Sequence, residues 1–539
     1  MSLRHYQRDC LDSLTNTLTS DKSTLFVMPV GTGKTVVFAE LVRQRLNQGR
    51  CLILAHRREL VEQAKRQIEH WSGVKADIEM GQERVAGKMF RSPITISTVQ
   101  SQCAGFGEQR RMHGFDPHEY GTLIIDEGHH ATMASYRTVI DHYVGQNGCK
   151  LVGCTATPNR SDKQTLKQVF QSCAYDYQFA DARRDGWLTD VRTMQPATLA
   201  LDFSEVNAAG GDLAAEQLAA MIEREKPYHA IAGAVLQGAP KLRTIIFTMK
   251  VEHAELVAEV FNRYEPGTAA CVHAKTPEDV RAEIVRAFRR GELLRLCNVD
   301  VFSEGFDVPE VGCILMARPH RSLLPYAQKL GRGLRPTVDL SAYVEAGQAP
   351  DRHRLIRGSD KPHLLVIDFT DSSGRHDLCT PLDVLGGIYP PDVVTLAKKY
   401  AKRAAVPQDV DSLLHKAYDE SQCRKAREAA RREHVKARME IHLEPFRAFG
   451  IPIRESYSWG GTTSATDKQA ALLRKFKVEN AEELTKAQAS ELIGAIFDRQ
   501  KRGLCTFGQA KWVRKFGHDP ENMAFAEAKA ILDRRFKRR

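Results

Sequence analysis

The segment 28-MPVGTGKT-35 places glycine, lysine and threonine at the spacing of a loop that binds phosphate groups. It follows the apolar run 23–28 and precedes the amphipathic run 36–46, so a strand, a loop and a helix are expected in the order that such a loop requires. The core GTGKTV could arise by chance in a glycine-rich turn, but the flanking strand and helix argue against chance. The sequence therefore predicts a nucleotide-binding loop.

Each residue of this loop has an expected task. At Gly31, Thr32 and Gly33 the backbone N–H groups can approach phosphate oxygens, and the start of the following helix adds partial positive charge. Lys34 is expected to reach the β and γ phosphates, and Thr35 to bind Mg²⁺. The predicted cofactors are therefore ATP and Mg²⁺.

Two adjacent carboxylates end another apolar run, in 123-LIIDEGHH-130. Asp126 would hold Mg²⁺, directly or through water, and Glu127 would orient and deprotonate an attacking water. Paired acids are also common at turns, but a position about 90 residues after the phosphate loop strengthens the catalytic interpretation. His129 and His130 do not indicate a metal site, because no Cys or further His lies at ligand spacing.

Short apolar runs alternate with amphipathic stretches through the first 190 residues, and the pattern repeats between about 240 and 370. Such alternation is typical of parallel sheets with helices on both faces, so the expected fold class is α/β, with two tandem lobes. The expected strands are 23–28, 51–56, 93–98, 122–127 and 150–156 in the first lobe, and 243–249, 269–274, 295–301, 313–319 and 363–369 in the second.

The composition changes after the second lobe, where a mostly α-helical and basic C-terminal domain is expected. A turn signal at Gly186-Trp187-Leu188 marks the start of a crossing between the lobes. The expected parts are a first, ATP-binding lobe at 1–190, an interlobe crossing segment and lead-in at 191–240, a second lobe at 241–375, a connector with a basic helix at 376–443, and a helical domain at 444–539.

Positive charge is concentrated at the C-terminal end. Residues 401–539 hold 29 Lys and Arg against 19 Asp and Glu, which is +10 of a formal net charge of +11. This asymmetry suggests a polyanionic partner, because phosphates attract Lys and Arg without reading sequence. A solvated basic surface is the alternative, and it applies also to the Arg-rich helix expected at 411–443.

The last 75 residues contain a weak internal repeat with a period near 40. Residues 466–476 align with 506–516, and 484–493 align with 523–532, so two stacked helical hairpins are expected. The Arg-Lys-Phe sequence that ends the first helix of each unit has two interpretations. It forms a paired phosphate-binding surface, or it belongs to a duplicated packing unit whose core includes Trp512.

The 12 cysteines form no CxxC pair and no Cys/His cluster at ligand spacing, so no zinc is expected. Several lie in apolar runs, where a free thiol acts as a small buried hydrophobe in a reducing compartment. The start MSLRHYQRDC lacks the apolar region of a signal peptide, and no stretch reaches the roughly 18 apolar residues of a membrane span. A cytoplasmic location and no membrane partner are therefore expected.

Eight segments resemble the motifs of superfamily 2 helicases and translocases, in the order of that family. The resemblance covers about residues 1–370 and is strongest to DExH-type DNA enzymes, among them RadD-like, XPB-like and restriction-type helicases, with DEGH as motif II. It implies two RecA-like lobes and ATP hydrolysis stimulated by nucleic acid. The segments are 28-MPVGTGKT-35, 55-AHRRELVEQ-63, 97-STVQS-101, 126-DEGH-129, 155-TATP-158, 247-FTMKVEHA-254, 302-FSEGFDVP-309 and 328-QKLGRGLRP-336.

The resemblance also implies nucleotide contacts outside the phosphate loop. Gln7, with Arg4 nearby, would read the adenine edge, and Gly305 and Asp307 would touch the nucleotide and couple it to the strand. Three residues of motif VI would face the γ-phosphate from the second lobe, where guanidinium groups stabilise the charge that develops during phosphoryl transfer. They are Gln328, Arg332 and Arg335.

Nucleic-acid contacts are implied from both lobes, mostly to phosphate and sugar, which positions a strand without specifying its sequence. Any of these residues could instead cap a helix or end a strand. His129 is implied to couple the two sites, as are Thr155 and Thr157 by bonding to motif II, with a simple turn as the alternative for the threonines. The implied contacts are Arg57, Thr98, Gln100, Thr248, His273 and Glu304.

Together these features favour an ATP-dependent DNA helicase or translocase acting in repair, recombination or phage replication. Motif II as DEGH, and Gln328 where a DEAD-box RNA helicase has His-Arg, favour DNA over RNA. The alternatives are an RNA helicase, the motor subunit of a restriction or defence complex with partners on other chains, and an inactive binding protein. The presence of Lys34, Asp126 and Glu127 argues against the last.

Overall fold

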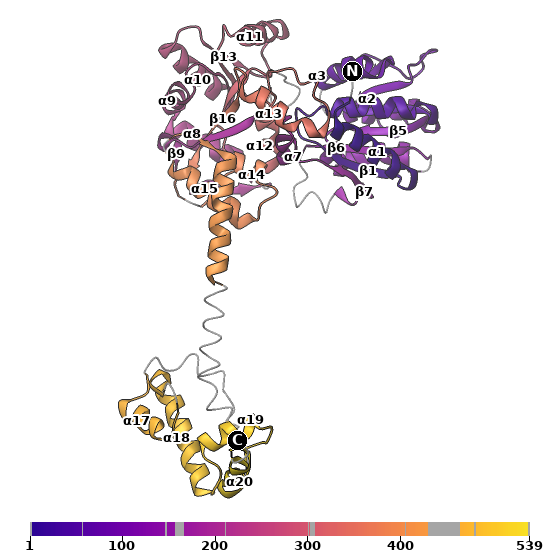
Figure 1. Ribbon diagram of the computed structural model, residues 1–539. Coiled ribbons are helices and arrows are strands. Elements are labelled where there is room, and N and C mark those ends of the chain that lie inside the picture. The colour runs from indigo at the N-terminus through magenta and orange to yellow at the C-terminus, as the bar shows by residue number, and fades with distance from the viewer. Residues whose placement is uncertain are drawn as a thin grey trace. The chain divides into compact units, whose positions relative to one another are not determined.

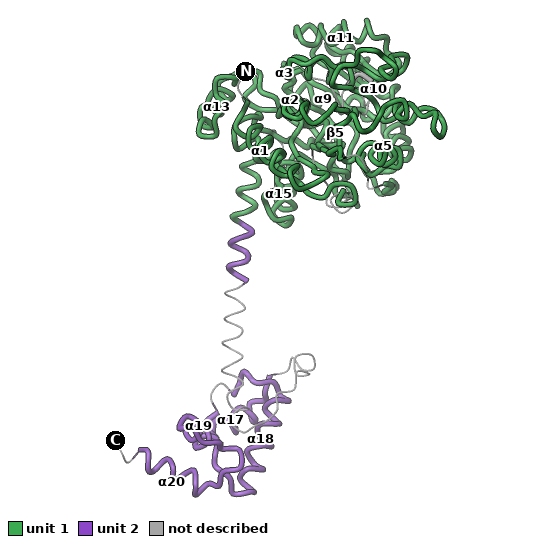
Figure 2. Tube along the Cα trace, turned by 90° about the vertical axis from the view of Figure 1, so that its right-hand side faces the viewer, with its two compact units in different colours: residues 1–419 green, residues 420–539 purple. Residues whose placement is uncertain are grey.

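The computed structural model describes most of the chain as two compact units, residues 1–419 and 420–539 (Figures 1 and 2). Among the described residues, no helix combines the length and the apolar character needed to cross a membrane. The described residues are 3–55, 58–145, 148–156, 166–210, 212–299, 301, 308–373, 375–404, 406–428, 464–478 and 481–536.

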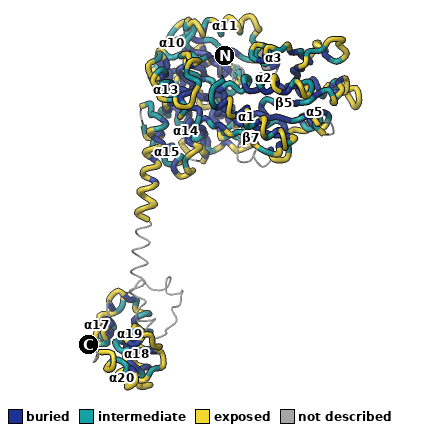
Figure 3. Tube along the Cα trace, turned by 45° about the vertical axis from the view of Figure 1, so that its right-hand side comes forward, coloured by how far each residue is buried: buried dark blue, intermediate teal, exposed yellow. Residues whose placement is uncertain are grey.

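The first lobe is built on a seven-stranded parallel sheet with the strand order β3-β4-β2-β5-β6-β1-β7. Strands β1 and β4 are buried at every residue, and β2, β5 and β6 at every residue but one, as expected for a sheet covered on both faces (Figure 3). The five expected strands are all present, and β3 and β7 are additional. The strands are β1 (Ser23–Val27), β2 (Arg50–Ala55), β3 (Ala76–Glu79), β4 (Ile94–Thr98), β5 (Tyr120–Ile125), β6 (Lys150–Thr155) and β7 (Ser172–Asp176).

Helices cover both faces of this sheet. Buried residues of the first three helices share one core with one face, and those of the next two share a second core with the other face. The helices are α1 (His5–Ser20), α2 (Lys34–Arg45), α3 (Arg58–Ser72), α4 (Val99–Cys103) and α5 (Ala134–Val144), and α7 (Phe179–Arg184) follows β7.

The second lobe has a seven-stranded sheet with the order β13-β14-β12-β15-β16-β8-β18, parallel except for the edge strand β18. The five strands expected here are present. Strand β8 pairs with β16 although it comes from the region between the lobes, so the second sheet begins earlier in the chain than the apolar pattern indicates. The strands are β8 (Asp190–Met194), β12 (Arg243–Phe247), β13 (Ala269–Val272), β14 (Arg295–Asn298), β15 (Val311–Met316), β16 (His363–Asp368) and β18 (Gln408–Asp409).

The helices of the second lobe again divide between two cores. Helices α8, α9 and α10 pack on one face, and α11, α12, α14 and α15 contribute to the core on the other. They are α8 (Ala215–Glu225), α9 (Tyr228–Gly238), α10 (Val251–Tyr264), α11 (Glu278–Arg290), α12 (Leu323–Leu330), α13 (Ala349–Arg357), α14 (Pro381–Leu385) and α15 (Pro391–Arg403).

Smaller elements complete the two units. Residues 410–428 are helical and belong to the connector expected at 376–443, of which 429–443 lies outside the described residues. Two short sheets pair β10 (Ala208–Ala209) with β11 (Asp212–Leu213) and β9 (Ala200–Leu201) with β17 (Thr370–Asp371). The 3-10 helices in the described part of the chain are Leu46–Gln48, Gly107–Gln109, Arg111–Gly114, Pro117–Glu119, Gly128–Thr132, Ala197–Leu199, Ala346–Gln348 and Ala481–Glu483.

The C-terminal unit contains two helical hairpins with a core of their own. Its helices are α17 (Asp467–Lys475), α18 (Lys486–Lys501), α19 (Phe507–Lys515) and α20 (Phe525–Phe536). The repeat extends to the caps, because Thr466 with Gln469 and Thr506 with Gln509 form the same capping box, 40 residues apart. Two helices per unit are thus present where the period predicts them.

Candidate functional site

The phosphate loop lies between β1 and α2, at the carboxyl end of the first sheet. Gly31 and Gly33 have φ angles of 88° and 84°, a left-handed conformation that favours glycine. Thr32 is buried, and its hydroxyl donates to the Pro29 carbonyl at 2.7 Å. The loop backbone is therefore held by its own residues in the conformation that exposes N–H groups to a phosphate.

The order of the strands brings the chemically important side chains together. Strand β6 lies between β5, which ends before Asp126, and β1, which ends before the loop. In the structure Lys34 Nζ donates to Glu127 Oε1 at 3.3 Å, and both side chains are largely buried. The two residues most important for phosphate chemistry thus lie in direct contact.

Lys34 and Glu127 each shift the pKa of the other toward the charged form. Burial alone would raise the pKa of Glu127, but the Lys34 ammonium and His129 hold it well below its ordinary value. Burial alone would lower the pKa of Lys34, but Glu127 holds it above its ordinary value. Both groups are therefore charged at neutral pH, as a phosphate-binding amine and a general base must be.

Glu127 also has an unusual backbone. Its φ is 54°, in the left-handed region that non-glycine residues seldom adopt, and it begins the 3-10 helix Gly128–Thr132. The Asp126 carboxylate accepts the Glu127 amide at 3.0 Å, and His129 Nδ1 lies 3.4 Å from Glu127 Oε2. The turn aims the Glu127 carboxylate at the phosphate loop and places the predicted coupling residue His129 beside it.

The first helix supports the loop from the other side. Tyr6 donates its hydroxyl to the Thr32 carbonyl at 2.6 Å, and the Gln7 side-chain amide donates to the same oxygen at 3.1 Å. The side-chain carbonyl oxygen of Gln7 accepts a hydrogen bond from the Arg4 backbone amide. A Cβ atom on Gly33 would lie 2.6 Å from Gln7 Nε2, so the predicted adenine-reading residue is in contact with the phosphate loop.

A tryptophan that the sequence marks only as part of a turn organises this region. Trp187 lies between two guanidinium groups, with Arg4 and Arg352 each 4.2 Å from its ring centre. Arg352, fully buried, comes from α13 of the second lobe and donates to the Asp185 carbonyl at 2.7 Å. The predicted nucleotide residue Arg4 is therefore held by cation–π contact, and Trp187 joins elements of both lobes.

Motif VI packs directly on the phosphate loop. A Cβ atom on Gly31 would lie 2.9 Å from Arg335 Cγ, and one on Gly331 would lie 2.7 Å from Val30 Cβ. The Thr189 amide donates to the Leu334 carbonyl at 2.9 Å. The arginine-bearing segment of the second lobe and the phosphate loop of the first thus form a continuous seam, which we call the nucleotide seam (residues 28–35, 126–127 and 328–335).

The helix that carries motif VI is fixed by a buried chain of polar groups. His320 Nδ1 lies 2.8 Å from Asp212 Oδ2, and His320 Nε2 lies 2.9 Å from Lys329 Nζ. Asp212 also accepts the Arg321 amide just before α12. Burial and the Lys329 charge lower the pKa of His320 to about 4, so the imidazole is neutral at pH 7 and can bridge the two charges.

The other residues of motif VI lie on or just after the same helix. Gln328 is a buried residue of α12, and Arg332 is half-buried two residues beyond the helix end. The Arg335 carbonyl accepts a hydrogen bond from Lys361 Nζ at 2.7 Å, which ties the end of the motif to the loop just before β16. All three predicted γ-phosphate residues therefore belong to one fixed segment.

Several predicted nucleic-acid contacts have local structural tasks. The Thr98 hydroxyl caps α4 by accepting the Ser101 amide at 3.1 Å, as the helix-cap alternative anticipates. The Thr248 hydroxyl donates to the Asn298 carbonyl at 3.2 Å and is buried. Gln100 is exposed, and His273 is half-buried at the end of β13. Among the predicted contacts within the described residues, Gln100 is therefore the exposed one and His273 is partly exposed.

The expected bond from Thr155 to motif II is not formed. The Thr155 hydroxyl is buried without a hydrogen-bond partner among the described residues, whereas its carbonyl accepts the Met28 amide at 3.0 Å. Thr155 is the last residue of β6, so it joins this strand to the phosphate loop through its backbone. The remaining predicted residues lie outside the described residues; they are Arg57, Thr157, Glu304, Gly305 and Asp307.

A magnesium ion fits the donors at the seam. Thr35 and Asp126 offer a hydroxyl and a carboxylate, the oxygen ligands that Mg²⁺ takes together with water and phosphate. Within the described part of the chain no group of three or more His, Cys, Asp or Glu side chains could hold a metal ion. A site that needs substrate oxygens is consistent with this finding, because it would show only two protein ligands.

Two protein families match the two lobes. The family described as type III restriction enzyme, res subunit, matches residues 1–160, and the helicase conserved C-terminal domain matches residues 228–337. A structure titled as a fragment of an HsdR subunit of a type I restriction enzyme from Vibrio vulnificus has a TM-score of 0.50 at 20% identity. It covers 72% of this chain and 67% of that one, which supports the fold alone.

Curated relatives are similar over the same region. IRC3 of Saccharomyces cerevisiae, whose name places it among ATP-dependent helicases, is 29% identical over 349 residues, which is 62% of this chain and 49% of that protein. The DNA 3'-5' helicase XPB of Mycobacterium tuberculosis is 27% identical over 342 residues, 62% of this chain and 58% of that protein. The chain thus spans about half the length of these relatives.

The matched domains and the paired sheets define the class of protein. The chain contains the two-lobed core of a superfamily 2 helicase, with tandem RecA-like lobes. The expected family and fold class are confirmed.

Proposed function

We propose that the protein is an ATP-dependent motor that moves along or remodels DNA. The observation that carries the proposal is the packing of Arg335 of the second lobe against Gly31 of the phosphate loop, beside the buried pair of Lys34 and Glu127. An amine and a base on one side and a guanidinium on the other are the groups that phosphoryl transfer from a nucleotide requires.

The residues suggest an order of events. In the absence of phosphate, Lys34 neutralises Glu127. A bound triphosphate would compete for the Lys34 ammonium, which would free the Glu127 carboxylate to orient and deprotonate water. Arg332 and Arg335 would then stabilise charge on the transferred phosphoryl group. Mg²⁺, held by Thr35, Asp126 and phosphate oxygens, would neutralise phosphate charge.

Movement would follow from the same seam. Because motif VI contacts the phosphate loop directly, hydrolysis and release would change the packing between lobes, and a strand held by both would be gripped and released. His129 next to Glu127, the exposed Gln100 and the half-buried His273 are the described residues best placed to sense that strand. This part of the proposal concerns the coupling between ATP hydrolysis and the grip on the strand, which ATP turnover alone does not measure.

DNA is the proposed substrate class. Motif II as DEGH and Gln328 in motif VI support it, as does similarity to a protein named as a DNA helicase. RNA is the alternative substrate, and similarity to an HsdR structure keeps a restriction or defence motor as the second candidate function, with partners on other chains. Repair, recombination or phage replication is the proposed setting. All 12 cysteines are free and most are buried, which supports a reducing, cytoplasmic location.

The decisive experiment compares ATP turnover with single-stranded DNA, duplex DNA, forked DNA and RNA. We expect strong stimulation by at least one DNA and weaker stimulation by RNA of matched length and structure. Equal stimulation by RNA would favour the RNA helicase, and no turnover with any nucleic acid would refute the motor. Copurification of a nuclease or methylase subunit would favour the restriction motor.

A further inference from the structure

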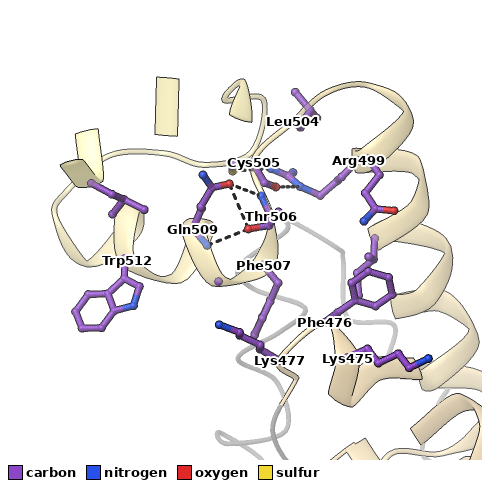
Figure 4. Close-up of a pocket in the computed structure, with 14 residues that line it drawn as sticks. Lys475, Phe476, Lys477, Arg499, Leu504, Cys505, Thr506, Phe507, Gln509 and Trp512 are labelled. Atoms are coloured by element: carbon purple, nitrogen blue, oxygen red, sulfur yellow. Dashed lines mark hydrogen bonds between the residues drawn. The ribbon is translucent and has the colours of Figure 1, made fainter. Parts of the chain in front are cut away.

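The C-terminal unit contains a groove of about 450 Å³ at the junction of its two hairpins. Figure 4 shows Phe476 and Lys477, which follow α17, opposite the start of α19, with Trp512 at the far end. One wall therefore comes from each repeat. Within the described residues, the groove combines the end of α17 in the first repeat with the start of α19 in the second.

The described residues that line the groove are apolar, polar or cationic, and none of them is acidic. Lys475 and Lys477 both line it, and neither forms an ion pair with any described residue. In Figure 4 the two lysine side chains extend in opposite directions along one edge. Two separated charges suit an extended polyanion better than a small compact anion.

Aromatic rings are available at both ends. Trp512 is 41% exposed, and Lys515 Nζ lies 5.1 Å from its ring centre. Phe476 lines the groove and packs edge-on against Phe497 with ring centres 5.9 Å apart. Exposed rings beside cations are the features on which unpaired bases stack, because every base has a π face.

The wall formed by the second repeat is rigid. Arg499 is buried and donates to the carbonyls of Cys505, Pro520 and Glu521, at 3.2, 2.7 and 2.6 Å. The Arg499 guanidinium is thus occupied by hydrogen bonds within the C-terminal unit, and it joins the end of α18 to the loop before α20. A fixed wall reduces the entropy lost on binding a flexible strand.

Lys477 occupies a position where a lysine is unfavourable for the backbone. Its φ is 61°, and the equivalent residue of the second repeat is Gly517, with φ of 84°. Glycine adopts this conformation without strain, whereas a residue with a side chain adopts it less favourably. The first repeat therefore has a lysine at the groove where the second repeat has the less strained residue.

We propose that this groove binds a single-stranded nucleic acid, with phosphates on Lys475 and Lys477 and bases stacked on Trp512 and Phe476. The proposed site is independent of the nucleotide seam, because none of its residues belongs to that seam. This single site between the repeats differs from the paired phosphate-binding surface that is one of the two interpretations of the repeat.

The test uses the full-length protein without nucleotide and a fluorescent oligo(dT) strand of about 20 nucleotides, longer than one such site requires. Binding is measured by anisotropy over a range of salt. Lys475→Ala with Lys477→Ala should weaken binding at least about tenfold and reduce the log-log salt slope by about 1.4, or about 0.7 per lost contact. The matched control is Lys468→Ala with Lys486→Ala, which removes two exposed lysines that do not line the groove.

The stacking contribution is tested by two substitutions of one residue. Trp512→Ala should weaken binding about tenfold, and Trp512→Phe should restore most of the affinity, because a smaller ring still stacks. Equal losses in the groove and control lysine pairs, or equal binding by Trp512→Ala and wild type, would overturn the proposal. So would capture of an acidic peptide in place of oligo(dT).

Turnover of ATP separates this proposal from the motor proposal. Basal turnover without nucleic acid should be unchanged in every groove variant, because the seam is intact. Loss of oligo(dT) binding with normal basal turnover supports the groove, whereas an inactive wild type refutes the motor and leaves the binding result valid.

Discussion

The nucleotide seam and the C-terminal groove both gather cationic side chains, but in opposite surroundings. In the seam, Lys34 is buried against Glu127, and Arg335 packs on Gly31. In the groove, none of the described residues that line it beside Lys475 and Lys477 is acidic, and Trp512 is exposed. The first arrangement fixes a few charges in a low-dielectric site, and the second leaves charges and rings accessible to a flexible polymer.

This difference teaches how the two regions should respond to mutation. A charge in the seam has one partner and one position, so moving it changes a transition state and the rate by orders of magnitude. A charge in the groove adds to a sum of similar contacts, so removing it changes affinity by modest factors. The predictions below test this contrast, in order of decreasing effect.

The largest effect is expected for Arg335→Ala, which should reduce stimulated ATP turnover by about 10³ to 10⁵-fold, as for other arginines supplied across a site. The reason is loss of charge stabilisation from the second lobe, so nucleotide binding should change much less than turnover. Steady-state turnover and nucleotide binding by calorimetry give the two values.

Two further variants sharpen this result. Arg335→Lys retains the charge without the planar guanidinium and should recover only part of the rate. Arg357→Ala is the matched control, because Arg357 is an exposed arginine of the same lobe. Turnover of Arg335→Ala within threefold of the control would show that the arginine has only a packing role.

Glu127→Gln should reduce turnover by about 10² to 10⁴-fold, the usual contribution of a general base. The amide keeps the shape of the side chain but cannot accept the proton from water. Binding of oligo(dT) should persist in the same variant, since the groove is unaltered. Glu108→Gln, at an exposed position, serves as control. Parallel losses of turnover and strand binding would contradict the separation of the two regions.

The sequence predicts the strands and motifs of the nucleotide seam better than it predicts the side-chain contacts that support them. All ten expected strands are present, because their apolar runs are long and buried. The sequence does not predict β7, which is half-exposed, or β8, which comes from the sequence between the two lobes and pairs in the second sheet. The contact of Lys34 with Glu127 follows from the two motifs at the ends of β1 and β5, the strands on either side of β6. The Trp187 contacts do not, because they join residues more than 150 positions apart that have no shared motif.

A smaller effect is expected for Asp212→Asn, because Asp212 acts on the nucleotide seam only through the helix that carries motif VI. The loss of charge should weaken its bonds to His320 and to the backbone before α12, and so loosen the helix that carries motif VI. We expect kcat to fall roughly tenfold with little change in KM, as for a small misplacement of reacting groups. Asp202→Asn, at an exposed position of the same crossing segment (191–240), is the control. A change in KM alone would argue against a positioning role.

The smallest effect concerns stability. It tests how burial changes the pKa of a carboxyl group that has no part in the proposed chemistry. Asp368 is buried and accepts the Tyr326 hydroxyl at 2.9 Å, and burial raises the pKa of its carboxyl to about 8. The unfolded chain releases this proton near pH 4 and the folded chain only near pH 8, so the contribution of Asp368 to stability falls as pH rises between these values.

Asp368→Asn should therefore flatten the pH dependence, with little change near pH 4 and a higher thermal midpoint above pH 8. The amide oxygen can still accept from Tyr326 but takes no charge. A rise of at least about 2 °C at pH 8.5 is expected, the size of shift that roughly 1 kcal/mol produces in a large domain. Asp360→Asn, at an exposed position of the same lobe, should show no such change. If both variants follow the wild-type profile, Asp368 titrates normally, and burial in this lobe does not by itself perturb a carboxylate without a cationic partner.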